Sequence, residues 1–397
     1  MTIRQRVAGL AAAAFTSIAV AHPAPAAADL PRVHVDAGRA IADATKTPAR
    51  MVIRGPGGYA GRIGIEVRGG VSRTFAKKSF SLETRSAGRQ ARNVGLLGMP
   101  RENDWILSAA HADPSLVRDH LAYATARRLG RWAPRTRFVE LYLEGRYHGV
   151  YVLAEQLKLD PARVAVPRDG VSGGYLVEMS SSPLTGGFTG LSADRSYGHK
   201  DPGRRQLEDD EAGWIAGYVQ AAERAVAARD GTWRTVVDES AAVDYLLLQE
   251  LFKNYDAFLR SVFLAKGTDR PLQFGPVWDF DRSMGLDLAG SPVGVHGWIT
   301  AGRPWAADLL ADRAFPVRLA ARWRELRRAN LLGHIVRRLD RTATTLRGDR
   351  ERNARRWPRA RVASPAAEQR RLRGWLIERV RWIDTNLQSL TTQGADR

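Results

Sequence analysis

The spacing of apolar residues changes part-way along the chain, and this change restricts the fold more than any other feature. Before about residue 180, apolar and polar side chains alternate over stretches such as 62–68 and 75–83, which is typical of half-buried strands. After about residue 208, apolar residues recur at helical spacing, and the helices predicted there span 211–229, 241–253, 306–310, 316–329, 331–346 and 366–390. This order predicts an α+β protein with a β-rich N-terminal lobe and a helical C-terminal lobe.

Shorter signals add detail to the first half. Residues 114–129 predict a helix, which Asp113 would cap. The runs 138–143 and 147–153 flank a short turn and predict a hairpin, and 174–179 predicts one more strand. After that strand the composition shifts to Ser, Gly, Pro and charged residues, which predicts a long flexible loop.

The first 28 residues have the organisation of a secretory signal peptide. Arg4 and Arg6 precede an apolar stretch, 7–20, and small residues run up to Ala28. We therefore expect a secreted or cell-surface protein after cleavage near Ala28. The predicted segments are a signal peptide (1–28), a β-rich N-terminal lobe (29–180), a flexible loop (181–207), a helical lobe (208–330) and basic C-terminal helices (331–397).

The composition excludes some classes and points to an anionic partner. The absence of cysteine excludes a disulfide scaffold and a thiolate metal site. The formal charge is +19, and from residue 318 onward 21 arginines face 8 acidic residues. No zinc-finger spacing, RNP-type motif or basic zipper accompanies this charge, so nucleic acid is not the expected partner. The arginines either form a solvated helical face or contact an anionic wall polymer or lipid. The sequence does not predict an oligomeric state.

Three aspartates follow the strongly apolar predicted helix 241–253. Asp256 stands just beyond the C-terminal end of this helix, and Asp279 and Asp281 stand beyond a predicted hairpin, 261–277. Such a hairpin can return the chain to Asp256 and bring the carboxylates together. Convergent carboxylates cost free energy unless a cation neutralises them, and oxygen ligands favour Mg²⁺ or Mn²⁺. The alternative is that these aspartates are helix caps and turn formers.

This order of helix, aspartate, hairpin and aspartate resembles the catalytic centre of protein kinases. A narrower resemblance is carried by an ordered series of motifs within roughly residues 45–330. The series comprises Lys77-Lys78-Ser79-Phe80-Ser81-Leu82, Leu96-Leu97-Gly98-Met99-Pro100, Asn103-Asp104-Trp105-Ile106-Leu107, Leu116-Val117-Arg118-Asp119-His120-Leu121-Ala122, Phe138-Val139-Glu140-Leu141-Tyr142-Leu143, Gly149-Val150-Tyr151-Val152-Leu153, Glu155-Gln156 and Trp278-Asp279-Phe280-Asp281. Together these motifs resemble the spore coat protein H (CotH) kinase family.

The resemblance implies an atypical protein-kinase-like, two-lobed fold that transfers the γ-phosphate of ATP to Ser or Thr hydroxyls of a protein with Mg²⁺ or Mn²⁺. By position, Asp256 matches the family's catalytic aspartate and Asp279 its Mg²⁺-binding aspartate, with Asp281 as a second acidic neighbour. Asn254 would steady the catalytic loop. Ser261 stands where kinases and many family members carry a metal-binding Asn, so a second metal would be lost or held by Asp281.

Further residues are assigned to the nucleotide by analogy with kinases. Strand parity places Lys78 on the buried side, so Lys78 is assigned to the α- and β-phosphates of ATP, and Lys77 is the alternative. Glu155 is the candidate ion-pair partner of that lysine. The remaining candidates are Glu178 and Met179, at a strand end where a kinase hinge would meet adenine, and Arg118, which either contacts phosphate or is an ordinary helix-surface arginine.

Two other functions fit the same residues. Outside the cell, where ATP is scarce, a kinase-like fold can act as a non-catalytic surface adhesin. Alternatively, the fold can transfer a nucleotidyl group from ATP instead of a phosphate. Thermal stabilisation by Mg-ATP separates the adhesin from the two enzymes, and the mass of the modified acceptor separates added phosphate from added AMP.

Overall fold

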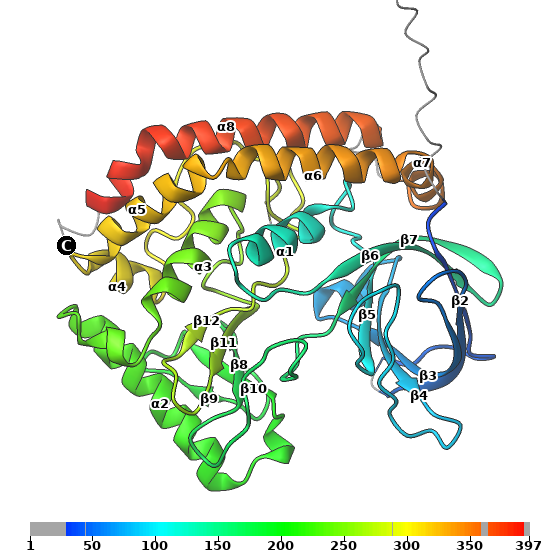
Figure 1. The fold of residues 1–397 in the computed structure, drawn as a ribbon, viewed down its shortest axis with the longest axis horizontal. Coiled ribbons are helices and arrows are strands. Elements are labelled where there is room, and N and C mark those ends of the chain that lie inside the picture. The colour runs from blue at the N-terminus through cyan, green and yellow to red at the C-terminus, as the bar shows by residue number, and fades with distance from the viewer. Residues whose placement is uncertain (1–28, 44, 288, 359–363, 393–397) are drawn as a thin grey trace, which may run out of the picture.

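The computed structural model describes residues 29–392 apart from 44, 288 and 359–363. The predicted signal peptide, 1–28, lies outside the described residues. The described chain is a mixed α+β protein, as the change in apolar spacing predicts. A barrel of strands lies at one end, and a second sheet with most of the helices lies at the other (Figure 1).

The barrel is formed by the N-terminal part of the chain. Its strands, as far as the chain is described, are β1 (Arg32–Asp36), β2 (Thr47–Ile53), β3 (Tyr59–Arg68), β4 (Ser79–Arg85), β5 (Asp104–Ser108), β6 (Thr136–Leu143) and β7 (Arg146–Glu155). They pair in the order β1-β2-β3-β4-β5-β7-β6, and parallel pairing of β1 with β6 closes the ring. Alternate side chains such as Ile63, Leu82 and Trp105 fill the interior, so the barrel has a packed core.

A second, antiparallel sheet lies beside the barrel. Its strands are β12 (Gln273–Phe274), β11 (Val262–Lys266), β8 (Tyr175–Ser180), β10 (Ser196–Asp201) and β9 (Phe188–Thr189), paired in that order. Because β8 lies between β10 and β11, this sheet combines a strand of the β-rich half with the hairpin that follows the apolar helix.

The helices pack around the second sheet and along one side of the molecule. They are α1 (Arg118–Arg128), α2 (Asp209–Ala228), α3 (Glu239–Phe252), α4 (Ala306–Ala311), α5 (Phe315–Arg328), α6 (Leu331–Thr345), α7 (Arg347–Arg356) and α8 (Pro365–Thr392), with short 3₁₀ turns at Val71–Thr74, Arg204–Gln206 and Thr232–Thr235. In Figure 1, α6 and α8 run side by side and α7 lies against the barrel, where it contacts β7. None of the helices in the described chain combines the length and the apolarity that spanning a membrane requires.

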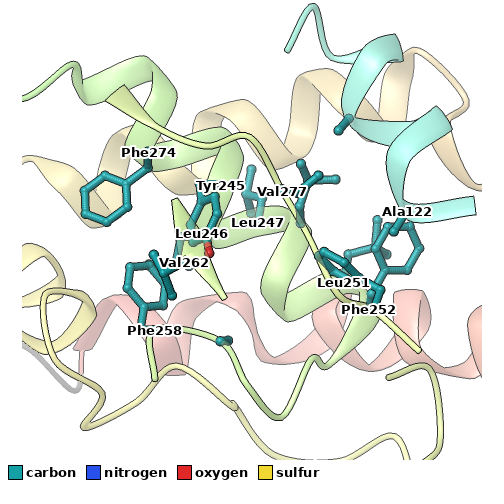
Figure 2. Packing of buried hydrophobic residues seen from close by; sticks show 14 of the residues in the cluster. Ala122, Tyr245, Leu246, Leu247, Leu251, Phe252, Phe258, Val262, Phe274 and Val277 are labelled. Carbon is teal, nitrogen blue, oxygen red and sulfur yellow. The ribbon is translucent and has the colours of Figure 1, made fainter. Parts of the chain in front are cut away.

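The largest hydrophobic core surrounds α3. Figure 2 shows Tyr245 and Leu246 of α3 near Phe258, Val262 and Phe274. Every residue of α3 from Ala241 to Phe252 is buried, which explains why most of its sequence is apolar. This packing fixes the position of the chain that leaves the C-terminal end of α3.

Two expectations about local structure are wrong. Residues 181–207 are not one long loop, because β10 pairs with β8 in the second sheet and Tyr197 of β10 is fully buried. The helix expected over 114–129 begins only at Arg118. The carboxylate of Asp113 accepts the backbone N–H groups of Ser115 and Arg118, and Leu116 has a φ of 66°, so the chain turns once before the helix starts. The hairpin of β6 and β7 is confirmed.

Candidate functional site

A cavity of about 460 Å³ lies between the barrel and the second sheet. Its barrel wall comes from the end of β3, the turn after it, β5 and β7, and its opposite wall comes from α1, β8 and the loops after α3 and β12. The lining includes Asp256, Asp279 and Asp281, so the hairpin brings together the three aspartates that the sequence singled out.

Asn254 links the two acidic loops. The chain leaves α3 through Lys253, whose φ is 47°, and enters the turn that carries Asp256. The Asn254 Oδ1 atom accepts the N–H of Asp256 at 3.3 Å, and its Nδ2 donates to the carbonyl oxygen of Asp279 at 3.4 Å. One buried amide therefore sets the distance between the two loops.

The acidic loop after β12 is not an extended strand. Asp279 has a φ of 62°, and the chain turns at Asp281, so the two aspartates do not follow strand parity. Both side chains nevertheless line the cavity. Ser261 Oγ donates to Asp279 Oδ2 at 3.3 Å, so the serine is within reach of the same carboxylate.

Sequence reasoning missed Asp119, a fourth aspartate in the cavity. Asp119 and Tyr123 lie one turn apart on α1 and face the acidic loop. Asp119 Oδ1 accepts the N–H of Phe280 at 2.8 Å, and the Tyr123 hydroxyl oxygen accepts the N–H of Asp279 at 3.3 Å. Asp119 stands within one of the quoted motifs, and its spacing to Tyr123 was the signal that could have found it.

Burial is the main reason that ionisation of all four carboxyl groups is unfavourable. Burial, with the nearby charge of Asp279 as the second cause, raises the pKa of Asp119 to about 7. Burial and the charge of Asp279 raise the pKa of Asp256 and, much further, that of Asp281. Burial also raises the pKa of Asp279, against the lowering effect of Arg68. A bound cation would favour the ionised form of these buried carboxyl groups.

The donor set fits a hard divalent cation that brings ligands of its own. In the part of the chain that the structure describes, no three or more His, Asp or Glu side chains are arranged to hold a metal by themselves. Mg²⁺ bound together with substrate phosphates needs only one or two carboxylates. Asp279 and Asp281 offer these oxygens, and the buried Oδ1 of Asp256 has no hydrogen-bond partner.

The structure corrects the assignment of the lysine. Strand β4 begins only at Ser79, so strand parity does not apply to the two lysines before it. Lys77 is 1% exposed and lines the cavity, and its Nζ donates to the carbonyl oxygens of Ala109 (2.8 Å) and Val150 (2.5 Å) and to Asn353 Oδ1 (3.0 Å). Lys78 is outside the cavity lining, and its Nζ donates to the carbonyl oxygen of Arg73.

Arg68, at the end of β3, is a second residue that the sequence reasoning missed. Its guanidinium lines the cavity, stacks on Trp278 with 5.4 Å to the ring centroid, and is attracted by Asp279, Asp119 and Glu178. Among the described residues it makes no hydrogen bond or ion pair. Its donors are therefore available to a ligand, whereas the three N–H groups of Lys77 already have acceptors. An arginine at a strand end gave no signal in the sequence.

Two other predicted contacts are wrong. Glu155 does not pair with a lysine: its carboxylate accepts the backbone N–H of Arg135 at 2.7 Å and its Nη1 at 2.8 Å. Arg118 does not reach the cavity. It is fully buried, forms ion pairs with Asp113 and with Glu368 of α8, and donates to the carbonyl oxygen of Ser283 at 2.9 Å. Its role is to join α1, the acidic loop and α8.

The strand assigned to a hinge does not have free backbone groups. Glu178 and Met179 are paired on both sides, with β10 and with β11, so their backbone is not available to adenine as a kinase hinge would be. The Met179 side chain is buried in the core, whereas the Glu178 carboxylate lines the cavity near Lys200. Glu178 alone of the pair stays a candidate for ligand contact.

The family model described as CotH kinase protein matches residues 65–383, a span that contains every residue lining the cavity. No curated protein matches the chain.

Proposed function

The chain belongs to the CotH kinase family, and from this premise we propose that it is a phosphotransferase that moves the γ-phosphate of ATP to a Ser or Thr hydroxyl of a protein. The observation that carries the proposal is the convergence of Asp256, Asp279 and Asp281 on one cavity that also presents Arg68. In this proposal the barrel and the helical part act as the two lobes of an atypical kinase-like fold.

The nucleotide is proposed to occupy the cavity with its phosphates toward the aspartates. A volume of about 460 Å³ is in the range of small-molecule sites. Arg68 supplies unused donors for phosphate oxygens, and Lys200 adds positive charge on the opposite wall. Asp279 and Asp281, with Ser261 beside them, would hold Mg²⁺ or Mn²⁺, which when bound neutralises phosphate charge.

Asp256 is proposed to receive the proton of the acceptor hydroxyl. Its Oδ1 is buried without a hydrogen-bond partner, and Asn254 holds its backbone in place. In the transfer, the bond from the acceptor oxygen to the γ-phosphorus forms, the bond from that phosphorus to the β-phosphate oxygen breaks, and ADP leaves with the electron pair. Positioning and charge stabilisation do most of the work in such a reaction.

The test is transfer of label from ATP with Mg²⁺ or Mn²⁺, looking first for self-labelling. Label should appear from γ-labelled ATP and not from α-labelled ATP, which would instead report nucleotidyl transfer. Asp256→Asn and Asp279→Asn should each lower the rate by about 10²-fold or more. The matched control is Asp269→Asn, an exposed aspartate in the same hairpin, which should keep the wild-type rate. Unchanged transfer in the Asp279 variant would remove the proposal.

We also propose that the protein is exported and acts outside the cytoplasm. The support is the predicted leader, 1–28, with its two arginines, apolar stretch and small residues. Expression with and without these residues tests it: the full chain should reach the medium or cell surface with a new N-terminus near Asp29, and the shortened chain should stay inside.

A further inference from the structure

A cluster of cations lies on α6, away from the cavity. His334, Arg337, Arg338 and Arg341 recur at helical spacing, so they share one face, and Arg128 at the C-terminal end of α1 joins them. Arg128 Nη2 is 2.6 Å from His334 Nε2, and Arg337 Nη2 is 3.2 Å from His334 Nδ1. These five residues are called the α6 basic face.

The contacts at His334 cannot satisfy both arginines. A neutral imidazole has one nitrogen that accepts and one that donates, and a guanidinium has donors only. At least one of Arg128 and Arg337 therefore points an N–H group at another donor. The fold thus places at least one guanidinium against another donor and beside other positive charges.

Carboxylates do not compensate this charge. Arg128, Arg337 and Arg341 are exposed, and none of them forms an ion pair with an acidic residue in the described ranges of the chain. Asp340, on the same helix, pairs with Arg373 at 3.6 Å. Like charges one turn apart destabilise a helix, so this arrangement costs stability when no anion is present.

We propose that the α6 basic face binds a flexible polymer of phosphate groups. Arginine favours phosphate because its planar donors match two oxygens at once. The face holds none of the exposed large apolar residues of the described chain, which are Val71, Val171, Leu191 and Val317. It therefore lacks the apolar residues that insert into a bilayer, and the aromatic residues on which bases stack. The α6 basic face therefore recognises its partner by charge alone.

The experiment measures binding of long-chain inorganic polyphosphate to the full chain at several salt concentrations. The variant Arg128→Gln/Arg337→Gln/Arg341→Gln is compared with Arg54→Gln/Arg92→Gln/Arg224→Gln, which removes the same charge from exposed arginines elsewhere. Loss of three phosphate contacts should lower the slope of log affinity against log salt by about 2 and weaken binding at low salt by about tenfold or more. The control variant should keep both values close to those of the wild type.

Several results would overturn this inference. One is an equal loss of polyphosphate affinity in the two variants, and another is no binding of polyphosphate by the wild-type chain. A third is tighter binding to anionic vesicles or duplex DNA than to polyphosphate at equal phosphate concentration. The melting temperature checks that the first variant folds, and it should not fall, because the substitutions relieve repulsion. Asp279→Asn should bind polyphosphate as the wild type does, so loss of phosphate transfer and loss of this surface are separable results.

Discussion

Lys77 and Arg68 are both cations at the cavity, and the number of donors that each has already used separates their roles. Lys77 donates to the carbonyl oxygens of Ala109, just after β5, and Val150, within β7, and to Asn353 of α7. Arg68 reaches the cavity with its donors unused. To bind a phosphate, Lys77 would have to break one of its three hydrogen bonds. Arg68 has no such bond to break.

Substitution of these two residues should therefore have different consequences. Arg68→Gln should weaken Mg-ATP binding by about tenfold, the loss of a charge-assisted contact, with little change in stability. Lys77→Ala should lower the free energy of unfolding by about 2–4 kcal/mol, because buried acceptors lose their donor. Calorimetric titration and urea denaturation measure the two quantities. If Lys77→Ala lost as much affinity for Mg-ATP as Arg68→Gln and lost no stability, this division of roles between the two residues would be wrong.

The raised pKa of Asp119 predicts a dependence of stability on pH. The carboxyl ionises near pH 3.8 in a model peptide and near pH 7 in the fold, so between these values the folded state binds more protons than the unfolded state. The contribution of this group to stability should be highest below about pH 4 and fall as the pH rises to about 7, by at most about 4 kcal/mol. In Asp119→Asn this decline should be smaller, as denaturant unfolding at each pH would measure; an identical slope would exclude Asp119 as its source.

At the scale of elements, α1 is the support of the acidic loop. Arg118, Asp119 and Tyr123 all bond to backbone groups between residues 279 and 284. The sequence predicted this helix and the aspartates beyond the hairpin, because both have strong local signals. It did not predict their contact, which depends on a tertiary arrangement that no local pattern encodes.

Removal of the Arg118 side chain should damage this support. Arg118→Met leaves the buried carboxylate of Asp113 without its cation and removes one of the two cations at Glu368, which should cost about 3–5 kcal/mol of stability. Thermal unfolding measures the loss. Arg371→Met is the matched control, because Arg371 also pairs with Glu368 but is about one-third exposed, and it should cost much less. Similar losses in both variants would show that burial of the pair is not the cause.

At the scale of the whole molecule, the sequence predicted the order of a β-rich part and a helical part but not how the parts share strands. β8 could be recognised as a strand, yet nothing in its alternation said that it pairs with β11 rather than with the barrel. β10 was missed because its Ser, Gly and Lys residues have the composition of a loop, and its pairing with β8 overrides that composition. Closure of the barrel likewise depends on β1 meeting β6 across about a hundred residues of chain.

The position of α7 has a consequence for ligand access to the cavity. Asn353 bonds to Lys77 and to the N–H of Val150, Trp357 donates to the carbonyl oxygen of His148, and Arg352 pairs with Glu140. These contacts fasten β6, β7 and the segment before β4 to α7 and to Trp357 just beyond it. The barrel cannot rotate away from the helices as a rigid body without breaking these contacts. Rigid movement of the barrel away from the helices would therefore cost the free energy of these contacts, whereas a movement confined to the turn at residues 69–72, which lines the cavity, would leave them intact.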